Sequence, residues 1–271
     1  MNEQALRRLT DAITDTVLRK IATGSKDGKA EAAANKITAL PSTVNDDITR
    51  MKQSTSARIA VGRAGARLRT DTYLAFRADH AAARDAVLLD VNLDFLARLG
   101  LESVSTRCAD KNEFLTRPDL GRVFPHESLE KIHTLNPEPV DVLVYLADGL
   151  SSRAVEANGE TILPILLEGL RGTGLKVGQP FFVCYGRVGT MEEITQTVGA
   201  AVTCVLLGER PGLGSAESMS AYFAYNAHPG MSESGRTVIS NIYAGGINAA
   251  EAGAYLTEAL ERAFREKKSG V

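Results

Sequence analysis

An apolar run from Ala201 to Leu207 passes directly into a glycine-rich segment, Gly208 to Gly214, which carries the neighbouring acid and base Glu209 and Arg210. An apolar run of this length, partly β-branched and followed by glycine, predicts a strand buried on both faces. Such strands belong to parallel sheets covered by helices. Ligands of open α/β sheets bind just outside the carboxyl ends of the strands. We therefore expect the glycine-rich segment to lie where a ligand binds, although a simple tight turn is the alternative.

Strand-like and helix-like segments alternate after a break at 136–139, which contains two prolines. The expected strands cover 140–147, 181–185, 201–207, 219–225 and 237–242. The expected helices cover 151–170, capped by Ser151 or Ser152 and interrupted by Pro164, then 191–198 and 249–265. This alternation predicts βαβ units. The fold class is therefore α/β, with a Rossmann-like, largely parallel sheet in the C-terminal domain over 136–271.

The chain before this domain has a mainly helical pattern. Residues 45–135 form an expected helical region, in which the alanine-rich stretch 70–89 places Tyr73, Leu74, Phe76, Ala81, Val87 and Leu88 at expected buried positions. Apolar residues at spacings of three and four predict an amphipathic helix over 4–22, and a polar linker follows it. Residues 1–44 therefore form a separate N-terminal part. Because a short helix cannot bury its apolar stripe alone, it packs on the same protein, on a partner or on a membrane surface.

Composition excludes several functional classes. The 271 residues are 44% hydrophobic and 24% charged, which is ordinary for a soluble globular protein. A net charge of −2 argues against a large basic surface for nucleic acid. No apolar run approaches the ~20 residues that span a bilayer, and the N-terminus lacks the apolar core of a secretory signal. We expect a cytoplasmic protein whose three separated cysteines are buried free thiols (Cys108, Cys184 and Cys204).

The familiar catalytic and nucleotide-binding motifs are missing. The glycine-rich segment contains neither Gly-Lys-Ser/Thr nor a complete Gly-x-Gly-x-x-Gly. There is no Gly-x-Ser-x-Gly, and none of the four histidines has a His or Cys partner at metal-ligand spacing. The residues thus predict no catalytic group and no metal site. Glu209 forms an ion pair or accepts hydrogen bonds from a ligand, whereas Asp148, after another expected strand, caps a helix or binds a polar ligand.

Seven short segments carry a specific resemblance when they are taken in order. They are Thr55 to Gly65, Tyr73 to His80, Leu115 to Arg122, Asp148 to Ser151, Tyr185 to Val188, Gly208 to Gly214 and Ile239 to Ile242. Two of them contain arginine-rich turns, whose cations are either solvated or face an anion or a partner subunit. In this order the segments resemble the small (light) subunit of ethanolamine ammonia-lyase, from about residue 45 to the C-terminus.

The resemblance implies a subunit of an enzyme that converts ethanolamine to acetaldehyde and ammonia by an adenosylcobalamin radical mechanism. In that family the large subunit, a TIM barrel, carries the substrate and radical chemistry. The small subunit holds the lower part of the cobalamin, so a hetero-oligomer with the corrin between the subunits is expected. Three family cobalamin contacts correspond to Val188, Glu209 and Val238. Related sequences carry cysteine in place of Val238, so only an apolar or backbone contact would be kept there.

The N-terminal helix lies outside the resemblance. Members of the family function in or near ethanolamine-utilisation microcompartments, and short amphipathic helices on linkers are typical packaging signals for such shells. We therefore hypothesise that the segment 4–22 directs the protein into a bacterial microcompartment. The alternative function for the whole chain is a non-catalytic, Rossmann-like binding or scaffold module without cobalamin affinity.

Overall fold

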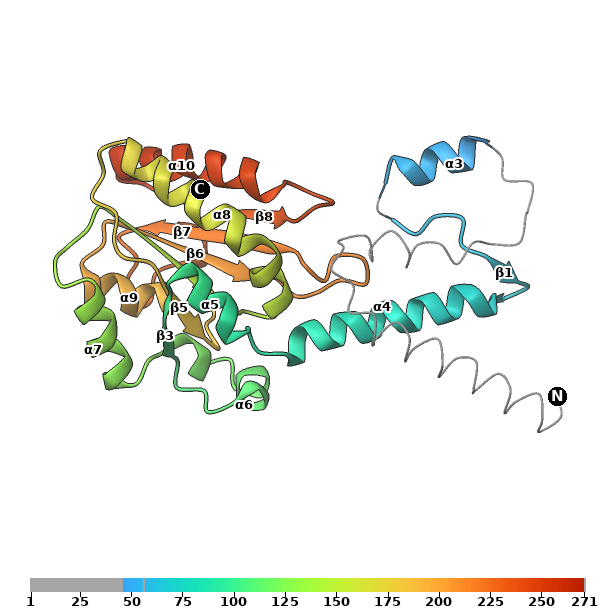
Figure 1. The fold of residues 1–271 in the computed structure, drawn as a ribbon, viewed down its shortest axis with the longest axis horizontal. Helices are drawn as coiled ribbons and strands as arrows, with labels where there is room; N and C mark the ends of the chain where they lie inside the picture. The colour runs from blue at the N-terminus through green and yellow to red at the C-terminus, as the bar shows by residue number, and fades with distance from the viewer. Residues whose placement is uncertain (1–45, 56, 271) are drawn as a thin grey trace. The chain divides into compact units, whose positions relative to one another are not determined.

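The computed structural model describes residues 46–55 and 57–270, and the chain divides into two compact units, up to Thr72 and from Tyr73 onwards (Figure 1). The first unit contains helix α3 (Asp46–Gln53). It also contains an antiparallel hairpin of β1 (Arg63–Ala64) and β2 (Arg67–Leu68). The amphipathic helix expected over 4–22 lies outside the described residues.

The second unit is built on a six-stranded sheet with the order β3-β5-β4-β6-β7-β8. The first four strands in this order run parallel, β7 runs antiparallel to β6, and β8 runs antiparallel to β7. Their bounds are β3 Glu102–Ser105, β4 Val142–Ala147, β5 Phe181–Cys184, β6 Val202–Gly208, β7 Met219–Tyr225 and β8 Thr237–Ile242. The predicted α/β class and the mostly parallel sheet are confirmed.

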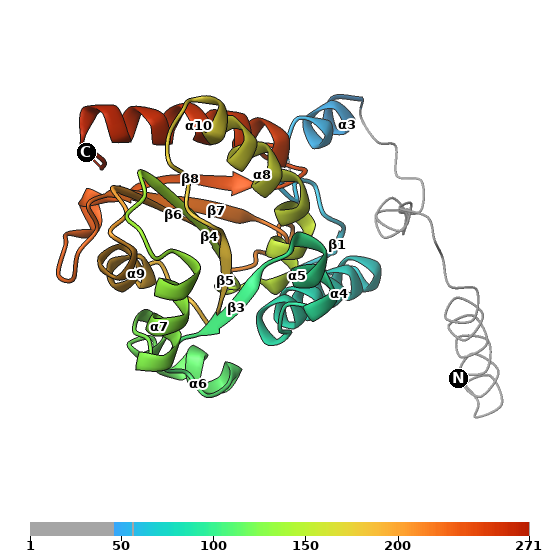
Figure 2. The ribbon, with the colours of Figure 1, turned by 60° about the vertical axis from the view of Figure 1, so that its left-hand side comes forward.

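Helices cover both faces of the sheet (Figure 2). On one face, α5 (Leu93–Leu99), α8 (Ser152–Gly172) and α10 (Ala249–Glu266) surround the first apolar core. On the other face, α7 (His126–Leu135) and α9 (Thr190–Val198) surround the second core. We call these the α8 face and the α9 face.

The central strand β4 supplies both cores. Val144 and Leu146 belong to the first core, whereas Tyr145 and Ala147 belong to the second. Alternate side chains of a strand point to opposite faces of the sheet, so a strand that is buried on both faces must be apolar throughout. All six residues of β4 are buried, as are all seven of β6. This explains why apolar runs located these strands in the sequence.

Two sequence expectations about helices are wrong. Helix α4 (Thr70–Leu88) forms as expected, but of the six expected positions Tyr73, Leu74, Ala81 and Leu88 are exposed and Phe76 and Val87 are only partly buried. The buried residues are Ala83 and Ala86. Ala83 and Ala86 lie three positions apart and so share one face of the helix, and this is the face that α4 buries.

Helix α8 also continues through Pro164, which was expected to interrupt it. Pro164 lies on the exposed side of the helix. The carbonyl group that loses its helical partner there can bond water instead. The predicted cap is confirmed, because the Ser151 side chain accepts a hydrogen bond from the backbone N–H of Ala154.

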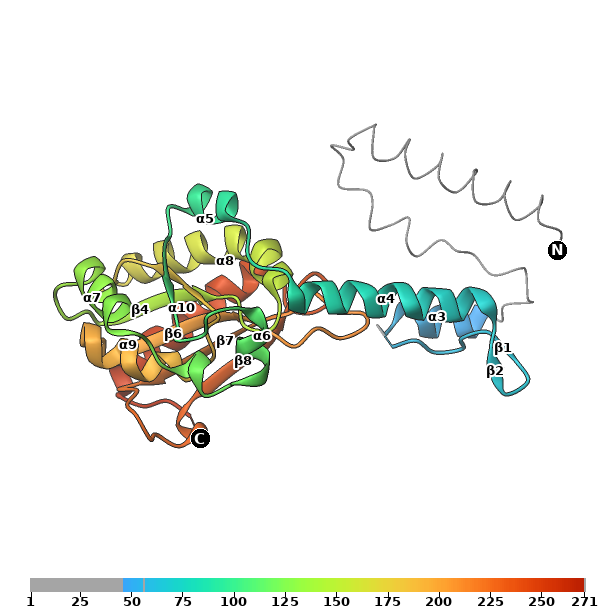
Figure 3. The same cartoon turned by 90° about the horizontal axis from the view of Figure 1, so that it is seen from below.

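The remaining short helices lie in the connections between strands. Helix α6 (Lys111–Thr116) and the short 3-10 helix η1 (Leu120–Arg122) follow β3, and the 3-10 helix η2 (Glu233–Gly235) precedes β8. The N–H of Gly270 donates to Thr237 Oγ1 at 2.8 Å, so the C-terminal residues lie beside the start of β8 (Figure 3). Among the described residues, no helix combines the length and the apolar character that crossing a bilayer requires.

Candidate functional site

The carboxyl ends of the parallel strands meet at one edge of the sheet. Ala147 of β4 pairs with Val183 of β5 and with Leu207 of β6, so these three strands end at the same level. Val188 follows β5 in the turn before α9, and Glu209 follows β6 directly. This edge is where open α/β sheets bind their ligands.

The exits of β4 and β6 are in direct backbone contact. The N–H of Leu150 donates to the carbonyl of Gly208 at 3.0 Å. A Cβ atom at Gly208 would lie 2.1 Å from the carbonyl oxygen of Ser151, and Gly149 adopts a φ of 55° with its Cβ position 2.4 Å from Gly208 O. Glycine is therefore required at both strand exits, because any side chain would separate the two loops.

Glu209 directly follows β6, and its carboxylate accepts hydrogen bonds from residues at the start of β7 and near the end of β8. Its Oε2 accepts a hydrogen bond from Ser218 Oγ at 3.1 Å, and its Oε1 accepts from the hydroxyl of Ser220 and, at 3.1 Å, from the backbone N–H of Asn241. A carboxylate offers about four acceptor positions, so one position on Oε2 remains for a ligand. In the described part of the chain no ion pair joins Glu209 to Arg210, so that sequence-based alternative is wrong.

A β-bulge aims the Asn241 N–H at Glu209. Met219 pairs with Ile242 while Ala221 pairs with Ile239, so two residues of β8 lie opposite Ser220. Asn241 adopts a φ of 60° in this bulge, a conformation that asparagine tolerates better than most residues. The segment Ile239 to Ile242 therefore contributes a backbone N–H to the site. The residue types of this segment did not predict the bulge.

The three predicted contact residues lie on the α9 face. Val188 is half-buried and packs on the second core. Val238 pairs with Tyr222, which packs on the same core, and directly paired residues share a face. Ser220 lies two residues before Tyr222 on that face and donates to Glu209. Residues from three separate segments of the chain therefore share the α9 face.

The part of the α9 face formed by β7 and β8 is incompletely covered. Val238 is 48% exposed, Ser240 is exposed and Tyr222 is half-buried. Tyr222 is level with Val205, four residues before Glu209, so Val238 lies ~13 Å along the strands from the carboxyl edge. Burial and the negative charge of Glu209 raise the pKa of Tyr222. These residues form an open shelf that begins at the carboxyl edge and extends towards the middle of the sheet.

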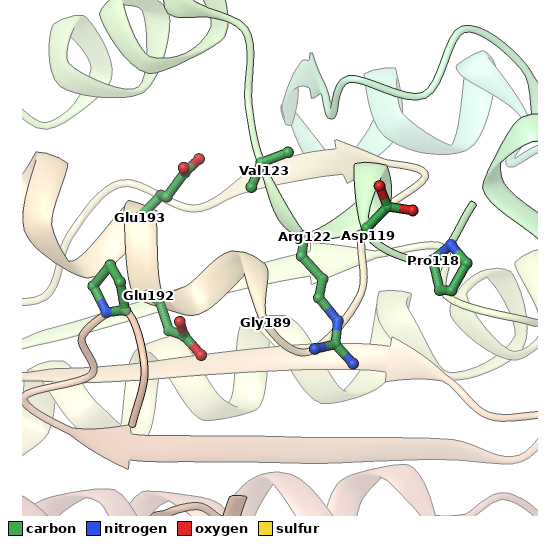
Figure 4. A pocket seen from close by; sticks show the side chains of 8 residues that line it. Pro118, Asp119, Arg122, Val123, Gly189, Glu192 and Glu193 are labelled. Atoms are coloured by element: carbon green, nitrogen blue, oxygen red, sulfur yellow. The ribbon is translucent and has the colours of Figure 1, made fainter. Parts of the chain in front are cut away.

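A cavity of about 520 Å³ opens beside the Val188 turn, at the start of α9 (Figure 4). Arg122 lies against Gly189, where a Cβ atom would be 3.2 Å from Arg122 Cγ. The three acids that line the cavity are engaged within the chain: Asp119 pairs with Arg117, Glu192 pairs with the buried Arg236, and Glu193 accepts the N–H of Phe124 at 2.8 Å. The sequence marked Arg122 as part of a basic turn but gave no signal for the cavity.

Asp148 makes different contacts from the helix cap that was expected of it. Its side chain is only 3% exposed, and it accepts hydrogen bonds from the Gly186 N–H at 3.1 Å and from Lys111 Nζ at 3.2 Å. Burial raises the pKa of Asp148, and the positive charge of Lys111 opposes that shift. The helix is capped by Ser151 instead. Lys111 is a functional candidate that the sequence patterns missed, whereas Asp148 was noted for its place after a strand but without this partner.

Comparisons with known proteins agree with the resemblance. The family model of the ethanolamine ammonia-lyase light chain (EutC) matches residues 45–271. The ethanolamine ammonia-lyase small subunit of Clostridium tetani is 53% identical over 226 residues, which are 83% of this chain and 76% of that protein. The protein of the same name from Fusobacterium nucleatum is 48% identical over 228 residues, covering 84% and 77%. That of Lachnoclostridium phytofermentans is 42% identical over 292 aligned positions, covering 100% and 99%.

Proposed function

Because the chain belongs to the ethanolamine ammonia-lyase light-chain family, we propose that it is the small subunit of an adenosylcobalamin-dependent ethanolamine ammonia-lyase. The relatives are named small subunits, which supports a large subunit as the partner in a hetero-oligomer. The complex would convert ethanolamine to acetaldehyde and ammonia, with a TIM-barrel large subunit carrying the substrate. This chain would supply no catalytic residue and would hold one side of the cofactor.

The observation that supports the cofactor assignment is that Val188, Glu209 and Val238 all lie on the α9 face, with Val238 on the open shelf and the other two at the carboxyl edge of the sheet. A large, flat ligand with peripheral amides fits this surface. The free acceptor position on Glu209 Oε2 can accept a hydrogen bond from an amide or hydroxyl group, while Val188 and the half-exposed Val238 offer apolar contact. Bound adenosylcobalamin would supply the radical chemistry, and the protein would position it.

The substitution of valine for the family's cysteine at position 238 is compatible with this role. Val238 projects from the shelf beside Tyr222, so its methyl groups are available to an apolar ligand surface. A contact through packing or through the backbone of β8 needs no thiol. We therefore propose that Val238 keeps its place in the cofactor site.

We also propose that the complex acts in the cytoplasm, within a bacterial microcompartment that the segment 4–22 helps it to enter. The amphipathic spacing of the apolar residues in 4–22 and the polar linker after them support this idea. Shell binding would be separate from cofactor binding, because the segment 4–22 precedes residues 45–271, which the family model matches and which contain all three proposed cofactor contacts.

Co-expression with a candidate large subunit tests the proposed function. Acetaldehyde should form from ethanolamine only when both chains and adenosylcobalamin are present. A protein that stays monomeric beside the large subunit, with no cobalamin affinity and no acetaldehyde formed, would contradict the proposal. That outcome would favour the alternative, a non-catalytic binding or scaffold module.

A further inference from the structure

The crevice between β4 and β5 has the topology of a ligand site. These two strands are neighbours in the sheet. The chain leaves β4 for α8, which packs on the first core, and leaves β5 for α9, which packs on the second. Adjacent strands whose connections leave to opposite faces form the topological switch point at which open α/β sheets bind ligands.

In this protein the chain's own charged side chains meet at the ends of these two strands. Lys111, from α6, has a side chain that is only 11% exposed, and its Nζ lies 3.2 Å from Asp148 Oδ2 and 3.5 Å from Asp90 Oδ1. The same ammonium group lies 5.1 Å from the centre of the Tyr185 ring and 5.6 Å from that of Phe114. Both distances are within the range of a cation–π contact.

The ion pair of Lys111 and Asp148 is in direct contact with the turn that carries Val188. The other oxygen of Asp148 accepts the Gly186 N–H at 3.1 Å, and Gly186 lies two residues before Val188. Tyr185, at the start of the turn, has a φ of 57°. A bulky residue adopts this left-handed conformation only where its surroundings impose it, and such residues cluster at functional sites.

The rest of the turn is held by residues that follow β3 in the chain. Thr106 Oγ1 donates to the carbonyl of Tyr185 at 3.1 Å, and Arg187 Nη2 donates to the carbonyl of Phe114 at 2.6 Å. Helix α6 therefore reaches the turn through two of its residues, Lys111 and Phe114. The chain's own side chains thus hold the turn between β4 and α6.

We propose that Lys111 and Asp148 are positioning residues, which fix the turn from Tyr185 to Val188 so that Val188 meets cobalamin in the right place. The inference rests on the proposed function. Both side chains are too buried to form much of the ligand surface, so they act through Tyr185 and Gly186. A buried ion pair is often no more stabilising than apolar packing of the same volume. Its presence here is better explained by the geometry that it imposes on the turn.

The test measures cyanocobalamin affinity by visible absorption in the complex co-expressed with a large subunit. Lys111→Met removes the ammonium group, keeps most of the side-chain volume and leaves Asp148 without its cation. We expect affinity to fall about tenfold, the size of effect typical of residues that act through others. Size-exclusion chromatography should show that the two subunits still assemble.

Two further variants separate positioning from a general loss of structure. The double variant Lys111→Met/Asp148→Asn has no buried charge, but the oxygen of the new amide can still accept the Gly186 N–H, so its affinity should return to nearly that of the wild type. Asp148→Leu removes the acceptor, and its affinity should stay low. Lys131→Met is the matched control, because Lys131 pairs with Glu102 at 2.8 Å and bonds Ser103 O at 3.1 Å at the other end of the parallel strands.

The outcomes distinguish this inference from the proposed function. If the wild-type complex binds no cyanocobalamin, the proposed function is wrong. If the wild type binds but Lys111→Met and Asp148→Leu bind equally well, or if Lys131→Met loses as much, the positioning role is wrong. If Lys111→Met fails to assemble with the large subunit, the two variants that change Asp148 are compared instead. Normal cyanocobalamin affinity in Asp148→Leu overturns the inference. Low affinity in Asp148→Leu together with nearly normal affinity in the double variant supports it.

Discussion

Replacing Glu209 should lower both folding stability and cofactor affinity, and two different substitutions distinguish these effects. Glu209→Ala deletes the acceptor for three donors, the hydroxyls of Ser218 and Ser220 and the N–H of Asn241. Both serines are buried, so their hydroxyls cannot turn to bulk water. At about 1 kcal/mol for each lost bond, the free energy of unfolding should fall by about 3 kcal/mol. In a unit of roughly 200 residues, this corresponds to a melting temperature lower by about 6–12 °C.

Glu209→Gln separates the two roles because it keeps the shape of the side chain. The amide oxygen must take the place of Oε1, where Asn241 presents a donor, so the NH2 group takes the place of Oε2. The Ser218 hydroxyl can rotate to accept from it. Stability should fall by only about 1 kcal/mol, but the free acceptor for the ligand becomes a donor. Cobalamin affinity of the complex should then fall about tenfold, or about 1.4 kcal/mol.

Thermal unfolding of the chain and absorption titration of the complex with cyanocobalamin measure the two effects. The exposed Glu168, on the far side of α8, provides a control variant, Glu168→Ala, which should match the wild type in both. If Glu209→Ala melts at the wild-type temperature, the bonding network described for its carboxylate is wrong. If Glu209→Gln binds cobalamin as tightly as the wild type, the ligand role of Oε2 is wrong.

Four other outcomes follow from the structure. Val238→Asp should change the free energy of unfolding by less than about 0.5 kcal/mol, because the side chain is half exposed, yet it should weaken cobalamin binding; equal affinity would remove Val238 from the site. Gly208→Ala should destabilise by more than about 3 kcal/mol, as judged by urea unfolding, since its Cβ would overlap Ser151 O; a stable variant would contradict the loop contact. Deleting residues 1–24 should leave acetaldehyde formation intact and abolish encapsulation, so normal encapsulation of the truncated protein would refute the packaging role. Cys108 and Cys204 are buried as expected but Cys184 is only partly buried, and desolvation raises the pKa of all three thiols, so in native protein at neutral pH a thiol reagent should react slowly and should titrate three thiols only after denaturation; rapid labelling of Cys108 or Cys204 would contradict their burial.

Strands β4 and β6, which are buried on both faces, could be predicted because their sequences are almost entirely apolar. The predicted bounds of β7 and β8 match the structure, and those of β4, β5 and β6 lie within two residues of it. Strand β3 could not be found in this way, because Glu102–Ser105 contains a single apolar residue and pairs on one side only. The Rossmann-like label and the division at residue 136 stay predictions. Strand β3 comes from the region 45–135, which was expected to be helical, and it joins the same sheet.

The candidate site was harder to predict, because its contacts join distant segments. The sequence indicated that Glu209 follows a buried strand, but its bonds to Ser220 and Asn241 depend on the antiparallel return of β7 and on the bulge in β8. Asp148 looked like a helix cap because it follows a strand and precedes a helix. Its true partner, Lys111, is 37 residues away and comes from a six-residue helix that has no strong pattern of its own.

A structure of the complex with a large subunit and bound cobalamin would test the central claim most directly. The account predicts that the cofactor lies against the α9 face, in contact with Val188, Glu209 and Val238, with the large subunit on its other side. A cofactor held only by the large subunit, or bound to this chain on the α8 face, would contradict it.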